Sequence, residues 1–182
     1  MSEAGYADPA GREPLWRPLG ALLIMYLIVT AWNLHIQTIF NPDEPRYAVP
    51  ARIMLNSREA NDWLIPEFNT QPRLFKPILF YWVIAATGAV GTSLGLDIAT
   101  AFRLGPLLMG LATVIGTFLL GRNLFGSRAG FIAAAMLTTA FFFHETARQL
   151  VVDMTLTAFL LWALVFCYLA LENYPGAEES AR

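Results

Sequence analysis

The sequence predicts an all-α integral membrane protein, and two observations support this prediction. Of the 182 residues, 56% are hydrophobic and only 14% are charged, and the mean hydropathy is +0.49. Because so few polar residues cannot cover a water-facing globule, lipid has to solvate many of the apolar side chains. The apolar residues also gather into long runs between short polar segments. This pattern is typical of a chain that crosses a bilayer several times.

The first apolar run, residues 19–40, holds about 22 residues without a charge, which is long enough to cross a bilayer. Residues 1–14 lack a basic segment and a small-residue cleavage site, so they predict a flexible tail rather than a removed leader. Arg17 precedes the run, whereas Asp43 and Glu44 follow it. By the positive-inside rule the tail is cytoplasmic, and a span over about 17–40 carries the carboxylate pair to the outer face.

The second apolar run, residues 77–91, predicts a juxtamembrane helix rather than a span. Only about 14 helical residues separate Pro77 from its closely spaced glycines, which is short for a crossing. Residues 121–128 contain Arg122 and Arg128 but no acid and are therefore predicted to be cytoplasmic, which requires residues 77–91 to stay outside. The predicted outer loop covers residues 41–101, with helices at about 44–57 and 77–92.

Three later apolar runs predict the remaining spans, at about 102–121, 129–149 and 153–173. The expected architecture is thus about four transmembrane helices, both ends in the cytoplasm, and a polar tail at 174–182. The single Cys167 rules out an intrachain disulfide. A net charge of −2, with basic residues scattered singly, argues against binding to nucleic acid.

This topology gathers charged side chains of both signs on the outer face. They are Asp43, Glu44, Lys76, Arg103, Arg148 and Asp153. Each also has a simpler explanation, because carboxylates cap helices, lysines snorkel and arginines anchor to lipid phosphate. However, lysine is also a good phosphate partner, and an arginine on the outer side runs against the usual bias. The group therefore predicts a site for an anionic ligand that is reached from the membrane.

Other polar and aromatic residues support less specific interpretations. His144-Glu145 begins like the zinc motif His-Glu-x-x-His, but Arg148 takes the place of the second histidine, so no metal site is predicted. His35 is interpreted as an interfacial or packing residue. The aromatic side chains Trp63, Tyr81 and Trp82 predict an interfacial belt, with sugar stacking as the alternative.

Several segments, taken in order, resemble a known family. They are Asp-Glu-Pro-Arg-Tyr-Ala at 43–48, Asn-Asp-Trp-Leu-Ile-Pro at 61–66, Phe68-Asn69, Lys-Pro-Ile-Leu-Phe-Tyr-Trp at 76–82, Arg103-Leu104, Gly121-Arg122, Phe125-Gly126, and Arg148 before Asp153-Met154. The series resembles the N-terminal part of the GT-C glycosyltransferases, in the superfamily of dolichyl-phosphate-mannose protein mannosyltransferases and aminoarabinose transferases. The resemblance covers roughly residues 42–172 and implies a partial GT-C fold.

The resemblance implies a glycosyltransferase of the plasma (inner) membrane. Such an enzyme moves a sugar from dolichyl or undecaprenyl phosphate to a hydroxyl or phosphate of a glycolipid, protein or polysaccharide on the extracytoplasmic face. Asp43 is then the catalytic base. Glu44 and Asp153 are the other catalytic carboxylates: Glu44 orients Asp43 or the acceptor, and Asp153 positions the sugar, the acceptor or one of the cations. The donor phosphate is bound by Lys76, Arg46, Arg103 and Arg148, and a single displacement inverts the anomeric carbon.

One departure from the family concerns the residue before Lys76. Aminoarabinose-transferase-like members commonly have Glu there, whereas this chain has Phe75, so a metal or acceptor contact through that Glu is in doubt. No cofactor is assigned, and a divalent cation stays open. Family members also have many more spans. The alternative function is therefore a non-catalytic, truncated membrane module that binds polyprenyl phosphate.

Overall fold

The structure is a computed structural model that describes residues 14–32, 34, 43–57 and 59–173. Its first part contains α1 (Trp16–Tyr26), a π-helical turn η1 (Leu27–Ala31), α2 (Glu44–Asn56), α3 (Ala60–Leu64) and a hairpin of β1 (Glu67–Phe68) and β2 (Gln71–Pro72). Its second part contains α4 (Ile78–Ser93), α5 (Ile98–Phe125), α6 (Ser127–Thr139), α7 (Phe141–Arg148) and α8 (Val152–Glu172). The described chain is mostly helical, as predicted.

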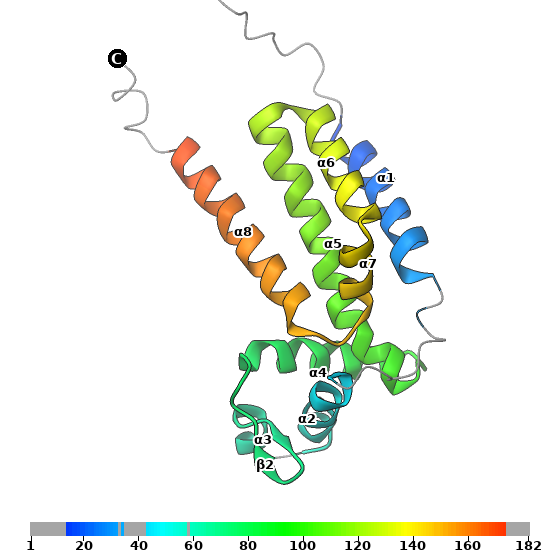
Figure 1. Ribbon diagram of the computed structural model, residues 1–182, viewed down its shortest axis with the longest axis vertical. Helices are drawn as coiled ribbons and strands as arrows, with labels where there is room; N and C mark the ends of the chain where they lie inside the picture. Colours follow the sequence, from blue (N-terminus) through cyan, green and yellow to red (C-terminus); the bar gives the residue numbers. More distant parts are fainter. Residues whose placement is uncertain (1–13, 33, 35–42, 58, 174–182) are drawn as a thin grey trace, which may run out of the picture.

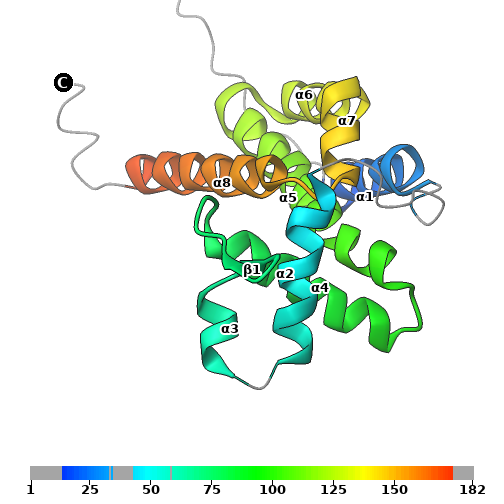
Figure 2. The ribbon, with the colours of Figure 1, turned by 60° about the horizontal axis from the view of Figure 1, so that its bottom comes forward.

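The helices form a bundle with a separate layer at one end. Helices α1, α5, α6 and α7 run along the long axis, while α8 leans away from them (Figure 1). Helices α2, α3 and α4 and the hairpin gather at one end of this bundle, where α4 lies across it. Seen from that end, α2 passes alongside α4 (Figure 2), and the two helices pack together. The predicted outer loop thus forms a folded cap on the bundle.

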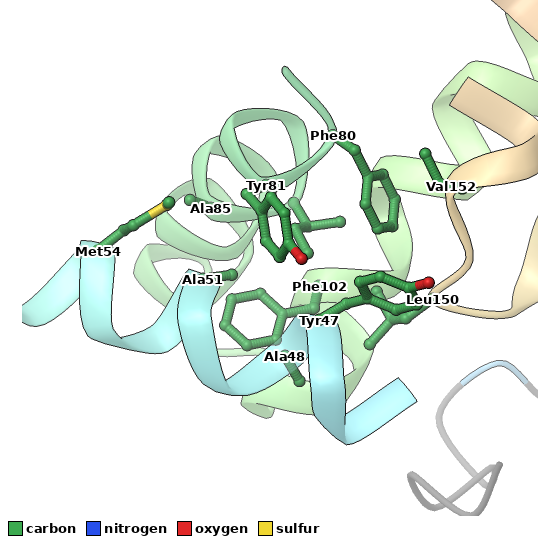
Figure 3. Packing of buried hydrophobic residues seen from close by; sticks show 11 residues of the cluster. Tyr47, Ala48, Ala51, Met54, Phe80, Tyr81, Ala85, Phe102, Leu150 and Val152 are labelled. Carbon is green, nitrogen blue, oxygen red and sulfur yellow. The ribbon is translucent and has the colours of Figure 1, made fainter. Parts of the chain in front are cut away.

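An apolar core joins this cap to the bundle (Figure 3). It is built from Tyr47, Ala48, Ala51 and Met54 of α2, Phe80, Tyr81, Ile84 and Ala85 of α4, Phe102 of α5, Leu150 between α7 and α8, and Val152 at the start of α8. The Tyr47 ring meets the Phe80 ring edge-on, with 5.1 Å between centroids. Aromatic pairs in this geometry add roughly 0.5–1.5 kcal/mol beyond their buried area. The core holds the start of α2 against the chain that enters α8.

Two of the predicted spans correspond to single long helices. Helices α5 and α8, with 28 and 21 residues, are long and apolar enough to cross a membrane. Large apolar side chains on α8 remain uncovered, such as Leu160, which is 59% exposed, and Phe166, which is 61% exposed. Side chains of this kind can be solvated by lipid. On its packed side, α8 donates a hydrogen bond from Trp162 Nε1 to the Ala112 carbonyl of α5, at 3.0 Å.

The other two predicted spans differ from single helices. The segment 129–149 was predicted as one span, but it is divided into α6 and α7 at Ala140, whose ψ of 126° is extended. The hydroxyls of Thr138 and Thr139 bond to the carbonyls of Ala134 and Ala135, a contact that often bends helices. For the segment 17–40, α1 and η1 cover residues 16–31, and residues 33 and 35–40, with His35 among them, lie outside the described part. Four crossings therefore remain a prediction.

Glycines allow α5 and α6 to approach closely where the chain turns between them. A Cβ atom on Gly121 would lie 2.8 Å from the Cα of Gly130. A Cβ atom on Gly130 would lie 2.6 Å from both the Arg122 nitrogen and the Phe118 carbonyl oxygen. These are backbone atoms of α5, so they cannot move aside as a flexible side chain would. The contact therefore requires glycine at both positions.

We expect Gly130→Ala to destabilise the protein by about 1–3 kcal/mol, because the helices must separate to admit the methyl group. The midpoint of SDS-induced unfolding in mixed micelles measures this loss. Gly20→Ala is the matched control, because no atom lies within 4 Å of a Cβ atom at Gly20 in α1. That change should be neutral or stabilising, since alanine is the better helix former. Equal effects of the two substitutions would contradict the close packing.

Candidate functional site

The centre of the candidate site is a buried ion pair between Glu44 of α2 and Arg103 of α5. Arg103 Nη2 lies 2.9 Å from Glu44 Oε2 and 3.1 Å from Oε1, and Arg103 Nε lies 3.3 Å from Oε1. The exposed fraction is 2% for Glu44 and 1% for Arg103. The Leu150 N–H also donates to Glu44 Oε1, at 3.1 Å. One carboxylate therefore joins α2, α5 and the segment between α7 and α8, and we call this arrangement the Glu44 clamp.

The start of α5 sets the position of Arg103. Asp97 caps this helix, and its side chain accepts hydrogen bonds from the N–H groups of Ala99 and Thr100 at 3.1 and 3.0 Å. Hydrogen bonds from Thr100 hold the pKa of Asp97 below its usual value. This cap fixes the first turn of α5. Arg103 follows in the second turn, where it faces the Glu44 carboxylate.

Burial changes the interpretation of both members of the pair. Arg103 was predicted to bind the donor phosphate, but its guanidinium is buried and occupied by two carboxylate oxygens. Glu44 was predicted to orient Asp43 or the acceptor in the catalytic site, with a helix cap as its simpler explanation, but it is held inside the fold by Arg103 and Leu150. Both residues therefore fit an anchoring role better than contact with substrate.

Asp43 lies next to the clamp but has a different environment. Its carboxylate is 52% exposed and accepts a hydrogen bond from Arg46 Nη1 at 2.7 Å. Asp43 occupies the N-cap position of α2, yet its side chain makes no capping hydrogen bond. The simple cap interpretation therefore fails for Asp43. Its carboxylate is half-exposed and is oriented by Arg46, three residues along the helix.

Asp153 lies at the start of α8, three residues after the Leu150 N–H of the clamp. Val151 takes the N-cap position, so Asp153 is not the cap that its sequence context also suggested. It stands exposed in the first turn, where a negative charge is favoured by the helix dipole. Thr155 in the same turn is 3% exposed, and its hydroxyl has no hydrogen-bond partner within the described part of the chain.

Arg148 ends α7 two residues before Leu150 and is 8% exposed. Its Nη1 lies 3.2 Å from His144 Nε2, while its buried Nε has no hydrogen-bond partner among the described residues. A buried donor without a partner costs free energy and calls for an explanation such as a bound ligand or ion. Arg148 therefore keeps a donor that an anionic ligand could satisfy.

Lys76 lies at the start of α4, just before Pro77 at the N-cap position. Its side chain is exposed, and no ion pair or hydrogen bond links it to another described residue. The predicted cation is therefore available at the surface of the cap.

Arg73 was missed by the sequence analysis. Its guanidinium carbon lies 5.8 Å from the ring centroids of both Tyr47 and Phe68. Its Nε is buried without a hydrogen-bond partner in the described structure. Burial raises the pKa of the Tyr81 phenol, although a hydrogen bond with Arg73 and the Arg73 charge oppose that shift. The phenol therefore stays protonated at neutral pH and can donate a hydrogen bond.

The hairpin explains how Arg73 reaches these rings. Glu67 pairs with Pro72 and Phe68 with Gln71, so Asn69 and Thr70 form the turn, with φ angles of 53° and 61°. Positive φ at both central residues is typical of the tight turn that matches strand twist. The Arg73 N–H then bonds back to the Pro66 carbonyl at 2.7 Å. The only sequence signal was a basic residue three positions before Lys76.

Comparison with known proteins gives the family. The sequence model of the dolichyl-phosphate-mannose-protein mannosyltransferase family matches residues 75–177, which is more than half of the chain. The chain belongs to this family. The matched region contains Lys76, Arg103, Arg148 and Asp153, whereas Asp43 and Glu44 precede it. The GT-C resemblance noted in the sequence is thereby confirmed.

Individual relatives agree with this assignment. A protein of unassigned function from Aquifex aeolicus (strain VF5) is 32% identical over 152 residues, which are 81% of this chain and 28% of that protein. The undecaprenyl phosphate-alpha-4-amino-4-deoxy-L-arabinose arabinosyl transferase of Edwardsiella ictaluri (strain 93-146) is 32% identical over 148 residues, which are 81% of this chain and 24% of that protein. A second such transferase, from Proteus mirabilis (strain HI4320), is 24% identical over 157 residues, which are 85% of this chain and 27% of that protein.

The chain thus spans about a quarter of the length of these relatives. No solved structure matches it significantly. Within the described residues, no three histidine, cysteine or acidic side chains gather as metal ligands would. The charged groups around the Glu44 clamp are the candidate site.

Proposed function

We propose that the chain forms part of a membrane glycosyltransferase that takes a sugar from polyprenyl phosphate. Family membership supports the reaction class. The Glu44 clamp is the observation that supports the site, because it ties the helix that begins beside Asp43 to the segment between Arg148 and Asp153. The predicted topology puts this site on the extracytoplasmic face of the plasma (inner) membrane, with the N-terminus in the cytoplasm.

Asp43 serves as the base in this proposal. Its exposed carboxylate takes the proton of an acceptor hydroxyl as the hydroxyl oxygen attacks the anomeric carbon of the sugar. The bond from that carbon to the phosphate oxygen breaks, and its electron pair leaves with the phosphate. One displacement of this kind inverts the anomeric carbon. An acceptor that is already an ionised phosphate needs no base, and then Asp43 orients the acceptor.

Cations are more useful to the leaving group than an acid is, because polyprenyl phosphate leaves as a stable anion. Lys76 and Arg148 supply them: Lys76 is exposed at the cap, and Arg148 keeps an unpartnered Nε. Arg46, which was predicted from the sequence to bind the donor phosphate, contacts Asp43 at 2.7 Å and orients its carboxylate in this proposal. Asp153 positions the sugar or the acceptor. Glu44 and Arg103 act as positioning residues that hold these segments together.

The names of the relatives suggest which donor to test first. Two of them are transferases named for undecaprenyl phosphate-linked 4-amino-4-deoxy-L-arabinose. We therefore propose undecaprenyl phosphate as the sugar carrier and a glycolipid, a protein or a polysaccharide as the acceptor. Because the sequence leaves a divalent cation open, the assay is run with and without one.

The test is a transfer assay with the purified full-length protein in vesicles that contain undecaprenyl-phosphate-linked sugar. We expect free undecaprenyl phosphate to be released only when an acceptor is present. Transfer of sugar from a nucleotide donor in vesicles without the polyprenyl donor would contradict the proposal. Tight donor binding without release, for every acceptor tested, would instead favour the non-catalytic module.

Lys76→Met should weaken the use of the donor more than the use of the acceptor. Loss of one charge-assisted hydrogen bond to the phosphate predicts a roughly ten- to hundredfold rise in KM for the donor. Arg52→Met is the matched control, because Arg52 is an exposed cation of the same cap on α2. Steady-state kinetics at varied donor concentration measure the effect. An unchanged donor KM in the Lys76 variant would remove Lys76 from the phosphate site.

A further inference from the structure

A cavity lies at the end of the bundle opposite the cap. There the start of α1 stands beside the turn from α5 to α6 (Figure 1), and α1 packs against α6. The cavity has a volume of about 370 Å³. It is lined by Arg17, Pro18, Ser127, Arg128, Phe131 and Ile132. We call it the α1/α6 groove.

The groove combines an apolar surface with two cations. Arg17 comes from the first turn of α1 and Arg128 from the first turn of α6, so the charges stand on two different helices. The walls deeper along the bundle are Phe131 and Ile132, and Ile132 is 58% exposed. A small soluble anion could contact both arginines but would leave these apolar side chains uncovered. The ligand that fits both features carries a phosphate and a hydrocarbon chain.

The surroundings of Arg17 are those of a membrane interface. Its guanidinium carbon lies 5.5 Å from the centroid of the Trp16 ring, and Trp16 is 69% exposed. Tryptophan is enriched where the bilayer meets water. Farther along the chain, Ile24 of α1 and Ile28 of η1 are 60% and 64% exposed, as expected for a face that meets lipid. The mouth of the groove therefore lies at the depth of lipid headgroups.

We propose that the α1/α6 groove binds one anionic phospholipid. Its headgroup phosphate lies between Arg17 and Arg128, and the first part of one acyl chain packs on Phe131 and Ile132. Basic pockets between membrane helices are known to favour anionic headgroups. The bound lipid would fasten α1 to α6 at the end where the positive-inside rule predicts the cytoplasm. This proposal is independent of the reaction at the other end.

The test is native mass spectrometry of the full-length protein released from vesicles of phosphatidylcholine mixed with phosphatidylglycerol. We expect phosphatidylglycerol to be retained in preference to phosphatidylcholine. Arg17→Gln combined with Arg128→Gln should weaken that retention roughly 30-fold, at about 1 kcal/mol for each arginine near the surface. Arg122→Gln should leave the retention of phosphatidylglycerol unchanged. Arg122 lies in the last turn of α5, at the same end of the bundle, but does not line the groove.

Two further variants and a competitor make the test decisive. Arg17→Lys with Arg128→Lys keeps both charges and should retain phosphatidylglycerol. If the double glutamine variant fails to fold, the lysine variant still tests whether the two positive charges are sufficient for binding. Ile132→Asp should also release the lipid, because it puts a charge beside the acyl chain. Equal retention of both lipids by the wild type would overturn the proposal. Displacement of the lipid by inorganic phosphate would also overturn it, because the groove would then be a simple anion site.

Discussion

Asp43→Asn should lower the rate of sugar transfer by about 10²–10⁴-fold, the range that a general base contributes. The asparagine keeps the size of the side chain but cannot take the acceptor proton. Since the Asp43 carboxylate is 52% exposed and makes no capping hydrogen bond, the fold should tolerate the change. The loss should fall on kcat, with little change in the KM for the donor. Initial rates in the vesicle assay measure both quantities.

The control for this substitution is Asp62→Asn, because Asp62 is an acid of the same predicted outer loop on α3. Its rate should stay at the wild-type value. Arg46→Met should give an intermediate loss, since it frees the Asp43 carboxylate from its 2.7 Å partner without removing it. An Asp43→Asn protein that still transfers sugar to a hydroxyl acceptor at the wild-type rate would remove Asp43 as the base.

The sequence predicted most helices because their limits are marked by composition. The apolar residues of α4 begin after Lys76-Pro77 and end at closely spaced glycines, and the helix lies at Ile78–Ser93, close to the predicted 77–92. The uncharged run of α8 begins after Asp153, and the helix ends at Glu172. The break at Ala140 has no such mark, because neither proline nor glycine occurs there. It depends on threonine hydroxyls and packing, which composition does not reveal.

The candidate site was predicted less well, and Asp43 and Glu44 show why. Successive residues of an α-helix point about 100° apart, so neighbours in the sequence can have opposite environments. Asp43 is open to solvent, whereas Glu44 is buried against Arg103, which lies 59 positions along the chain. The position after the first apolar run identified the acidic pair, but only the contact of α2 with α5 separates the two roles. Arg73 was missed because its partners come from α2, the hairpin and α4.

Breaking the Glu44 clamp should destabilise the protein by about 3–5 kcal/mol. Glu44→Ala leaves the Arg103 guanidinium buried without its partner, which is the costly way to lose a buried ion pair. It also leaves the Leu150 N–H without its acceptor. SDS-induced unfolding in mixed micelles measures the loss. The exposed pair of Asp43 and Arg46 is the internal comparison, since breaking it should cost far less than breaking the clamp.

The double variant Glu44→Leu with Arg103→Met separates stability from positioning. Two apolar side chains of similar volume can replace a buried pair at little cost, so much of the lost stability should return. Sugar transfer should stay low, because the carboxylate that held Leu150 against α2 is gone. Arg148 and Asp153, on either side of Leu150, are then no longer held in fixed positions relative to Asp43. Additive effects of the two single changes would show that the residues are not coupled. A stable double variant with wild-type transfer would make the clamp a structural feature alone.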